Sequence, residues 1–331
     1  MPIQWFPGHM NVTKKAIIER IKDTDVVIEL LDARLPGSSA NPMLEQLTGH
    51  RLKLKVLNKQ DLADATQTEA WLAWYNAQPN TRAIALDAGE TAPAQRLIKA
   101  CRELAPHRGG MAKPLRVMIC GIPNVGKSTL MNTLVGRKAA KTGDEAGVTR
   151  VEQRINLASD FYLFDTPGML WPKITVDQSG YHLAASGAVG RNAYEDEDVA
   201  LELLKSLREP YAAQLAARFK LDDVAAIPTT DEEVLLSEVG RKRGAVMGGG
   251  RINIAKAAEI VLHDFRAGLI GRITLETPEQ FAQWWAEGQA KEAEREAAKL
   301  ARKQKKHGSR KPADADADVD DDEEEDESDE G

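Results

Sequence analysis

The order of two short motifs constrains the fold of this chain more than any other feature. The tetrapeptide NKQD stands at residues 58–61, and the octapeptide GIPNVGKS follows only at 121–128. Each motif begins at the end of a predicted strand, at 51–58 and 115–121. In a domain that carries both motifs on one parallel sheet, the octapeptide ordinarily comes first. The inverted order therefore indicates a circular permutation, which is physically allowed when the original termini lie close together on the surface.

The octapeptide has the GxxxxGKS pattern of a phosphate-binding loop between a strand and a helix. Glycines let backbone N–H groups turn toward phosphate at the positive end of a helix. Lys127 is expected to neutralise the β- and γ-phosphates, and the Ser128 hydroxyl to bind Mg²⁺. The predicted nucleotide contacts of this loop are Asn124, Val125, Gly126, Lys127, Ser128 and Thr129.

The NKQD motif predicts recognition of guanine. The carboxylate of Asp61 can accept hydrogen bonds from guanine N1–H and N2–H₂, whereas adenine lacks this pair of donors and would leave the carboxylate unpaired. Lys59 is expected to lie along the plane of the base, and Asn58 to tie the motif to the phosphate loop. Binding of GTP and GDP is therefore predicted, and an ATPase or nucleotide kinase is disfavoured.

Two further segments complete the predicted site. In DTPG (165–168), Asp165 is expected to reach Mg²⁺, and the backbone N–H of Gly168 to contact the γ-phosphate. In GVTR (147–150), Thr149 is expected to complete the Mg²⁺ shell and to close a switch loop over the γ-phosphate. Thr142 is an alternative for that role, because the sequence around both threonines resembles a loop.

Apolar and helical segments alternate through the first half of the chain. Strands are predicted at 24–32, 51–58, 81–88, 115–121, 151–158 and 161–165, and a helix at 93–104. This alternation predicts an α/β fold with a mostly parallel sheet. From about residue 195 helical spacing dominates. We therefore predict a circularly permuted nucleotide-binding domain at 1–180, a smaller helical domain at 181–285, a basic helical extension at 286–311 and a disordered acidic tail at 312–331.

Charge is distributed very unevenly over these parts. Residues 312–331 hold 13 acidic residues and no basic ones, whereas 291–311 hold 9 basic and 3 acidic residues. The remaining body carries 35 charges of each sign, so the net charge of −7 describes no part of the molecule. The tail cannot bury apolar surface. It is expected either to fold back over the basic segment or to contact basic partner proteins.

Other features exclude several classes of protein. No apolar run approaches the roughly 18–20 residues of a membrane-spanning helix, and the first residues show no secretory signal. A cytoplasmic protein with no membrane partner is therefore expected. Cys101 and Cys120 are the only cysteines, which excludes a disulfide framework and predicts two buried thiols.

These motifs and their order resemble those of the circularly permuted, ribosome-assembly GTPases of the YlqF/RbgA type. The resemblance covers about residues 1–285 and includes WFPGHM (5–10) and DARLPGSSANP (32–42). It implies GTP hydrolysis coupled to maturation of the large ribosomal subunit, with rRNA and ribosomal protein stimulating a slow reaction. It also implies that the helical domain binds rRNA and that the protein is monomeric off the ribosome. The alternative is an RNA-binding chaperone that uses GTP mainly as a structural ligand.

The resemblance also bears on catalysis. Met169 follows DTPG where many GTPases carry a glutamine that orients the attacking water, and a methionine cannot do so by hydrogen bonding. In this family a histidine of the N-terminal motif is the proposed replacement, and it matches His9. The alternative is that the motif around His9 only docks the N-terminus or contacts the ribosome. Asn124 matches an asparagine associated with potassium, so K⁺ is expected beside Mg²⁺.

Two other groups of charged residues remain. Basic residues flank the glycine run GAVMGGG and are predicted to bind RNA phosphates, although a solvated loop is the alternative. They are Arg241, Lys242, Arg243 and Arg251. By contrast, Asp32 and Arg34 at the end of the first predicted strand are interpreted as a local ion pair without a part in the chemistry.

Overall fold

The computed structural model describes residues 3–87, 93–110, 112–135 and 153–308. The chain divides into two compact units, Met1–Gly288 and Gln289–Gly331, and each is considered by itself. Three features singled out in the sequence lie outside the described residues. They are Thr149, its alternative Thr142, and the acidic tail 312–331.

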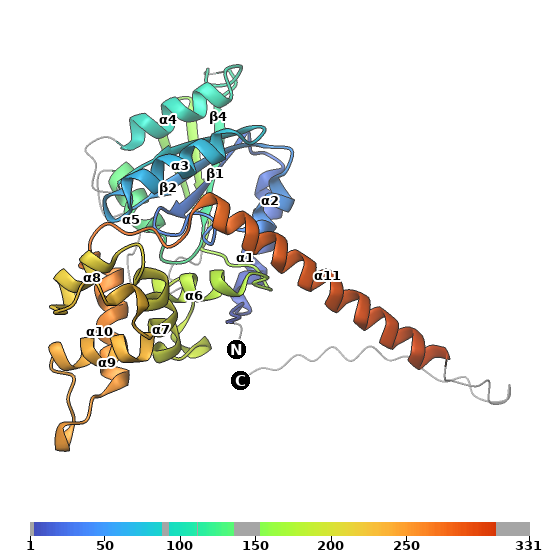
Figure 1. Cartoon of the computed structure of the whole chain (residues 1–331). Helices are drawn as coiled ribbons and strands as arrows, with labels where there is room; N and C mark the ends of the chain where they lie inside the picture. Colours follow the sequence, from blue (N-terminus) through green and yellow to red (C-terminus); the bar gives the residue numbers. More distant parts are fainter. Residues whose placement is uncertain (1–2, 88–92, 111, 136–152, 309–331) are drawn as a thin grey trace, which may run out of the picture. The chain divides into compact units, whose positions relative to one another are not determined.

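A six-stranded sheet with the order β3-β2-β1-β4-β6-β5 forms the centre of the first unit (Figure 1). Its neighbours pair in parallel except β5 and β6, which pair antiparallel. The predicted α/β fold with a mostly parallel sheet is confirmed. The strands are β1 (Val26–Asp32), β2 (Leu52–Asn58), β3 (Thr81–Ala85), β4 (Leu115–Gly121), β5 (Gln153–Ala158) and β6 (Phe161–Asp165).

Both faces of this sheet are buried. Successive side chains of a strand point to opposite faces, and all seven residues of β1 are buried. On β1, Leu31 packs with Leu57 and with Trp71 of a helix on one face. Its neighbour Leu30 belongs to the larger cluster, together with Leu97. Continuous apolar runs in β1 and β4 thus reflect strands covered on two sides.

Helices of the first half of the chain connect and cover these strands. They are α1 (His9–Ile21), α2 (Pro42–Thr48), α3 (Ala65–Asn76), α4 (Pro93–Leu104) and α5 (Lys127–Val135). Helix α2 starts with an effective cap, since the Asn41 side chain accepts hydrogen bonds from the backbone of Met43 and Leu44. The turn η1 (Gln60–Leu62) follows β2 and carries Gln60 and Asp61, the second half of the NKQD motif.

A helical part follows β6, and its helices pack mainly on one another. They are α6 (Asp177–Ser186), α7 (Asp196–Leu207), α8 (Ala212–Phe219), α9 (Glu232–Lys242) and α10 (Ile254–Arg266). Helix α7 contacts α6, α9 and α10. The short turns η2 (Arg191–Ala193), η3 (Ile227–Thr229) and η4 (Gly248–Gly250) lie in their connections.

Helix α11 runs without interruption over Pro278–Gly308, so the predicted domain limit at 285 falls inside a helix. The predicted limit at 180 likewise falls inside α6. Within the described ranges, none of the helices has the length and apolar character that crossing a membrane would require. The prediction of two buried thiols is confirmed, since Cys101 and Cys120 are both buried and unpaired, and burial raises the pKa of each.

Candidate guanine-nucleotide site

The predicted phosphate loop lies between the end of β4 at Gly121 and the start of α5 at Lys127. At Gly121, an added Cβ would lie 2.8 Å from the carbonyl oxygen of Leu30. Gly126 has a φ of +93°, and a Cβ there would collide with the side-chain amide of Asn58. Both positions therefore require glycine. A tight turn of this kind before a helix N-terminus is suited to hold phosphate.

Lys127 and Asp165 meet at the end of this loop. Nζ of Lys127 donates to Oδ1 of Asp165 at 2.5 Å, and both side chains are buried. Burial raises the pKa of Asp165, although the ammonium beside it acts in the opposite direction. The backbone N–H of Met169 donates to the Gly121 carbonyl at 3.1 Å, so DTPG lies against the phosphate loop as the sequence suggests.

The NKQD motif lies on the other side of the phosphate loop. Nδ2 of Asn58 donates to the Val125 carbonyl at 2.9 Å. Lys59 has a left-handed backbone, with φ of 60°, and its Nζ donates to the Asn124 carbonyl at 2.9 Å. Two motifs far apart in sequence are thus joined through main-chain carbonyls of the phosphate loop. Asp61 follows them on an exposed turn, where its carboxylate is accessible to a base.

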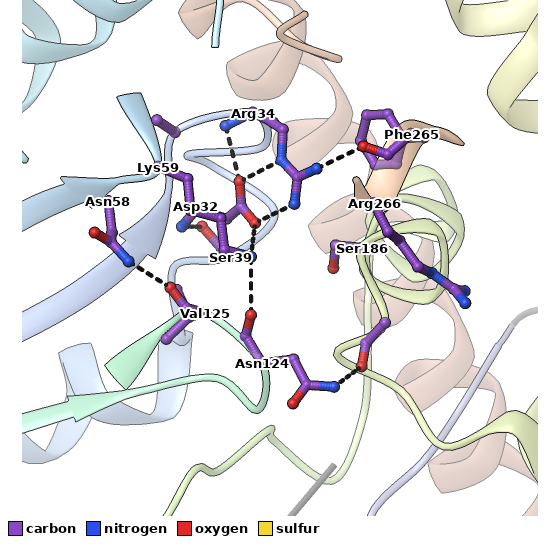
Figure 2. A network of polar contacts seen from close by, with 12 residues as sticks. Asp32, Arg34, Ser39, Asn58, Lys59, Asn124, Val125, Ser186, Phe265 and Arg266 are labelled. Carbon is purple, nitrogen blue, oxygen red and sulfur yellow. Dashed lines mark hydrogen bonds and ion pairs between the residues drawn. The ribbon is translucent and has the colours of Figure 1, made fainter. Parts of the chain in front are cut away.

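Asp32 and Arg34 lie beside these motifs, and the interpretation of the two as a local ion pair did not include their contact with Lys59. Asp32 accepts hydrogen bonds from Arg34 and also from Nζ of Lys59, the latter at 2.8 Å (Figure 2). Burial alone would raise the pKa of Asp32, but the charges of Arg34 and Lys59 outweigh it and hold that pKa well below its usual range. A local ion pair was predicted, and it is present. Its role as the support of a guanine-motif lysine depends on β1 and β2 being neighbours, which a local pattern does not reveal.

The other predicted site residues have different exposures. Val125 is buried, Ser128 is partly exposed, and Thr129 is exposed. The His9 side chain is exposed at the first residue of α1. The segment before it is docked, because Gln4 exchanges two hydrogen bonds with the backbone of Ile174, at 2.9 and 2.8 Å. The structure therefore ties the N-terminal motif to the chain that follows DTPG.

The residues predicted to bind RNA lie together on the helical part. Arg241 and Lys242 are in the last turn of α9, and Arg243 and Arg251 follow on either side of a glycine-rich projection (Figure 1). All four are exposed. Val246 and Met247, just before the turn Gly248–Gly250, are also exposed, at 47% and 44%. Lys242 forms an ion pair with Asp222.

The donor set at the phosphate loop suits Mg²⁺. This ion prefers hard oxygen ligands and commonly uses one or two protein oxygens together with nucleotide phosphates. Ser128 offers a hydroxyl and Asp165 a carboxylate. No group of three or more His, Cys, Asp or Glu among the described residues could hold a metal ion. A site that relies on phosphate oxygens is consistent with that finding.

Comparisons with known proteins agree with this geometry. A family model described as a 50S ribosome-binding GTPase matches residues 116–233. Ribosome biogenesis GTPase A of Bacillus cereus is 40% identical over 290 residues, covering 86% of this chain and 96% of that protein. Its counterpart in Priestia megaterium is also 40% identical, covering 86% and 99%. Mitochondrial ribosome-associated GTPase 1 of Xenopus tropicalis is 32% identical, covering 82% and 94%.

Solved structures support the fold. GDP-bound YlqF has a TM-score of 0.59 and 24% identity, and the match covers 80% of this chain and 99% of that one. GNP-bound YlqF from T. maritima has a TM-score of 0.58 and 24% identity, covering 81% and 98%.

Motif order, strand order and these similarities define a circularly permuted P-loop GTPase. The guanine motif follows β2, and the phosphate loop follows β4, on one sheet. The chain belongs to the ribosome biogenesis GTPase A family, because it matches those proteins over nearly their whole length. The expected family and the expected enzyme class, a GTPase, are thereby confirmed.

Proposed function

We propose that this GTPase is an assembly factor for the large ribosomal subunit that binds rRNA in a nucleotide-dependent way. The observation that carries the proposal is a chain of contacts from the NKQD motif to the helical part. Lys59 and Arg34 both donate to the Asp32 carboxylate, and Arg34 donates through Nη1 to the Phe265 carbonyl at the end of α10, at 2.9 Å. The relatives named for ribosome biogenesis and for ribosome association support the partner. A chaperone that only holds GTP is not favoured by a family named for GTPases.

The roles proposed for individual residues follow the motifs. Asp61 recognises guanine, and Lys127 neutralises phosphate. Ser128 and Asp165 hold Mg²⁺, together with Thr149. Loop N–H groups, including that of Gly168, contact the phosphates. Bound Mg²⁺ supplies charge neutralisation at the phosphates, while Lys127 and the loop orient them.

Potassium is proposed as a second cation, held by Asn124. The side-chain amide of Asn124 donates through Nδ2 to the Gly187 carbonyl at 2.8 Å, which fixes the orientation of that amide. A monovalent cation between phosphate oxygens would stabilise the transition-state charge that an arginine finger stabilises elsewhere. Hydrolysis should be faster in KCl than in NaCl, and equal rates would remove K⁺ from the proposal.

RNA binding is proposed for the exposed basic residues around the glycine-rich projection. Neutralisation of phosphates by lysine and arginine is strongly salt-dependent, so subunit affinity should fall steeply with ionic strength. Ribosomal proteins are proposed as further contacts, and the free protein is proposed to be monomeric and cytoplasmic.

Co-sedimentation tests the proposal as a whole. The full chain is mixed with immature and with mature large subunits, in GDP and in a non-hydrolysable GTP analogue. Association with subunits in the GTP-like state, and release in GDP, is the expected result. Equal association in both nucleotides would contradict nucleotide-dependent binding, and no association with either subunit would contradict the partner.

A further inference from the structure

The segment Arg272–Glu276, between α10 and α11, runs along the turn that carries the guanine motif. Nε of Arg272 donates to the Asp61 carbonyl at 3.2 Å, and the backbone N–H of Ile273 donates to the Leu62 carbonyl at 2.9 Å. Just before the segment, Gly268 lies so close to Leu62 that an added Cβ would be 2.6 Å from its Cδ2. Two consecutive carbonyls of the guanine turn are therefore held from the helical part.

The next residue of the segment extends this contact. Oγ1 of Thr274 accepts from the backbone N–H of Asp64 at 3.2 Å. The segment is itself anchored, because the Tyr211 hydroxyl accepts from the Thr274 N–H at 3.0 Å and donates to the Thr274 carbonyl at 3.1 Å. Tyr211 lies just before α8, so the anchor belongs to the helical part.

The guanine turn has few supports of its own. It is a single 3₁₀ turn, Gln60–Leu62, entered through the left-handed Lys59. Its internal bonds are Leu62 N–H to the Lys59 carbonyl at 3.0 Å and Ala63 N–H to the Gln60 carbonyl at 3.3 Å. From the sheet side, the backbone N–H of Gln60 donates to the Leu86 carbonyl at 3.3 Å. Recognition of a base by one carboxylate requires its two oxygens to be well placed, and external support of the turn provides that placement.

We propose that Arg272–Glu276 is a positioning element of the guanine site, in which Arg272 and Thr274 hold the turn so that the Asp61 carboxylate meets the base. The proposal rests on the guanine role of Asp61 proposed above. It makes the helical part a structural component of base recognition. Because GDP and GTP share the same base, disturbing this segment changes the affinity for both equally, unlike a switch that senses the γ-phosphate.

Affinities for GDP and IDP measured with the full chain test this role. Hypoxanthine, the base of IDP, keeps N1–H but lacks the 2-amino group, so the ratio of the two affinities reports the placement of the Asp61 carboxylate. Arg272 is exposed, so its replacement is expected to leave the fold intact. Arg272→Ala should weaken GDP binding roughly 2- to 12-fold, the equivalent of one hydrogen bond, and IDP binding by less. Thr274→Val, which keeps the side-chain volume, should likewise lower the ratio of the GDP affinity to the IDP affinity.

A matched control and a reference variant accompany these measurements. Lys256 is an exposed side chain of α10 that pairs with Glu259, and Lys256→Ala should leave the ratio unchanged. Asp61→Asn should lower the ratio most. If Arg272→Ala and Thr274→Val weaken GDP and IDP by equal factors, or leave both unchanged, this proposal is overturned.

Failure of the assembly role can be told apart from failure of this proposal. An unchanged ratio in Asp61→Asn would overturn the guanine role of Asp61 and the positioning role together. A chain that fails to sediment with large subunits, but whose ratio falls in Arg272→Ala, would contradict only the ribosomal partner.

Discussion

The guanidinium of Arg34 binds the carboxylate of Asp32 through two parallel hydrogen bonds, Nε to Oδ1 at 2.9 Å and Nη2 to Oδ2 at 2.8 Å. Both side chains are almost completely buried, at 2% and 1% exposure. The same carboxylate accepts a hydrogen bond from Nζ of Lys59, and the Arg34 guanidinium lies over the ring of Phe265. One buried anion therefore holds a guanine-motif lysine and an arginine that reaches the helical part.

Asp32→Asn should destabilise the fold strongly. The substitution removes the charge that compensates Arg34 and Lys59, and breaking a buried ion pair from one side costs about 3–5 kcal/mol. Urea unfolding at pH 7 measures the loss. As a control, Asp222→Asn removes a surface pair whose carboxylate side chain is 87% exposed, and should cost less than about 1 kcal/mol.

The difference in the free energy of unfolding between wild type and Asp32→Asn also has a defined pH dependence. The pKa of Asp32 is depressed in the folded state, so its contribution to the free energy of unfolding is complete above the unfolded pKa, about 3.9. The contribution disappears only as the pH falls through the lower, folded pKa. The difference should accordingly be the same at pH 7 and at pH 5, and a smaller difference at pH 5 would contradict the assignment.

Gly126→Ala should weaken nucleotide binding. A side chain at a φ of +93° is strained, and its Cβ would displace the Asn58 amide that links the two motifs. Strain of about 1–3 kcal/mol corresponds to a loss in GDP affinity of about 5- to 160-fold, measurable by titration. Gly110→Ala is the matched control, since an added Cβ there meets nothing within 4 Å. Equal affinities in the two variants would argue against the glycine requirement.

The strands and the motifs were predictable from sequence because both are encoded locally. Apolar runs gave the strand positions, and the motifs NKQD, GIPNVGKS and DTPG each begin where a strand ends. Strand β2 shows the limit of such patterns. Its alternation of leucine and lysine suggests a half-exposed strand, yet Lys53 and Lys55 are both buried, at 7% and 4% exposure. Lys55 pairs with Glu29 of β1 at 2.5 Å, and Lys53 pairs with Glu45 of α2, so tertiary partners override the local pattern.

The supports of the site could not be predicted, because they join distant parts of the chain. Arg272 contacts Asp61 across a sequence separation of 211, and Arg34 contacts Phe265 across 231. No periodicity or spacing relates such pairs. The Asp-Ala-Arg triplet at the end of β1 was the only available signal, since a charged pair directly after a buried strand faces the same sheet edge as the neighbouring motif.

Met169→Gln tests whether the glutamine of other GTPases could act at this position. The Met169 side chain is only 1% exposed and belongs to the main core cluster, and its carbonyl accepts Nδ2 of Asn41 at 3.0 Å. A glutamine there buries an amide, which costs about 1–3 kcal/mol, and it should not raise the hydrolysis rate. Thermal unfolding and single-turnover hydrolysis measure the two effects. Met169→Leu, a volume-conserving control, should cost less than about 1.5 kcal/mol, and faster hydrolysis in the glutamine variant would show that position 169 faces the reacting water.

His9→Ala decides between a catalytic and a docking role for the N-terminal motif. The side chain is exposed at the start of α1, so its removal should leave the free energy of unfolding and the GDP affinity unchanged. If His9 orients the attacking water, turnover stimulated by the large subunit should fall by about 10²-fold or more. Asn11→Ala, another exposed position of α1, is the control and should keep full turnover. Docking depends instead on Gln4 and Ile174, so a His9→Ala enzyme with full stimulated turnover would leave the motif as an anchor and remove His9 from the chemistry.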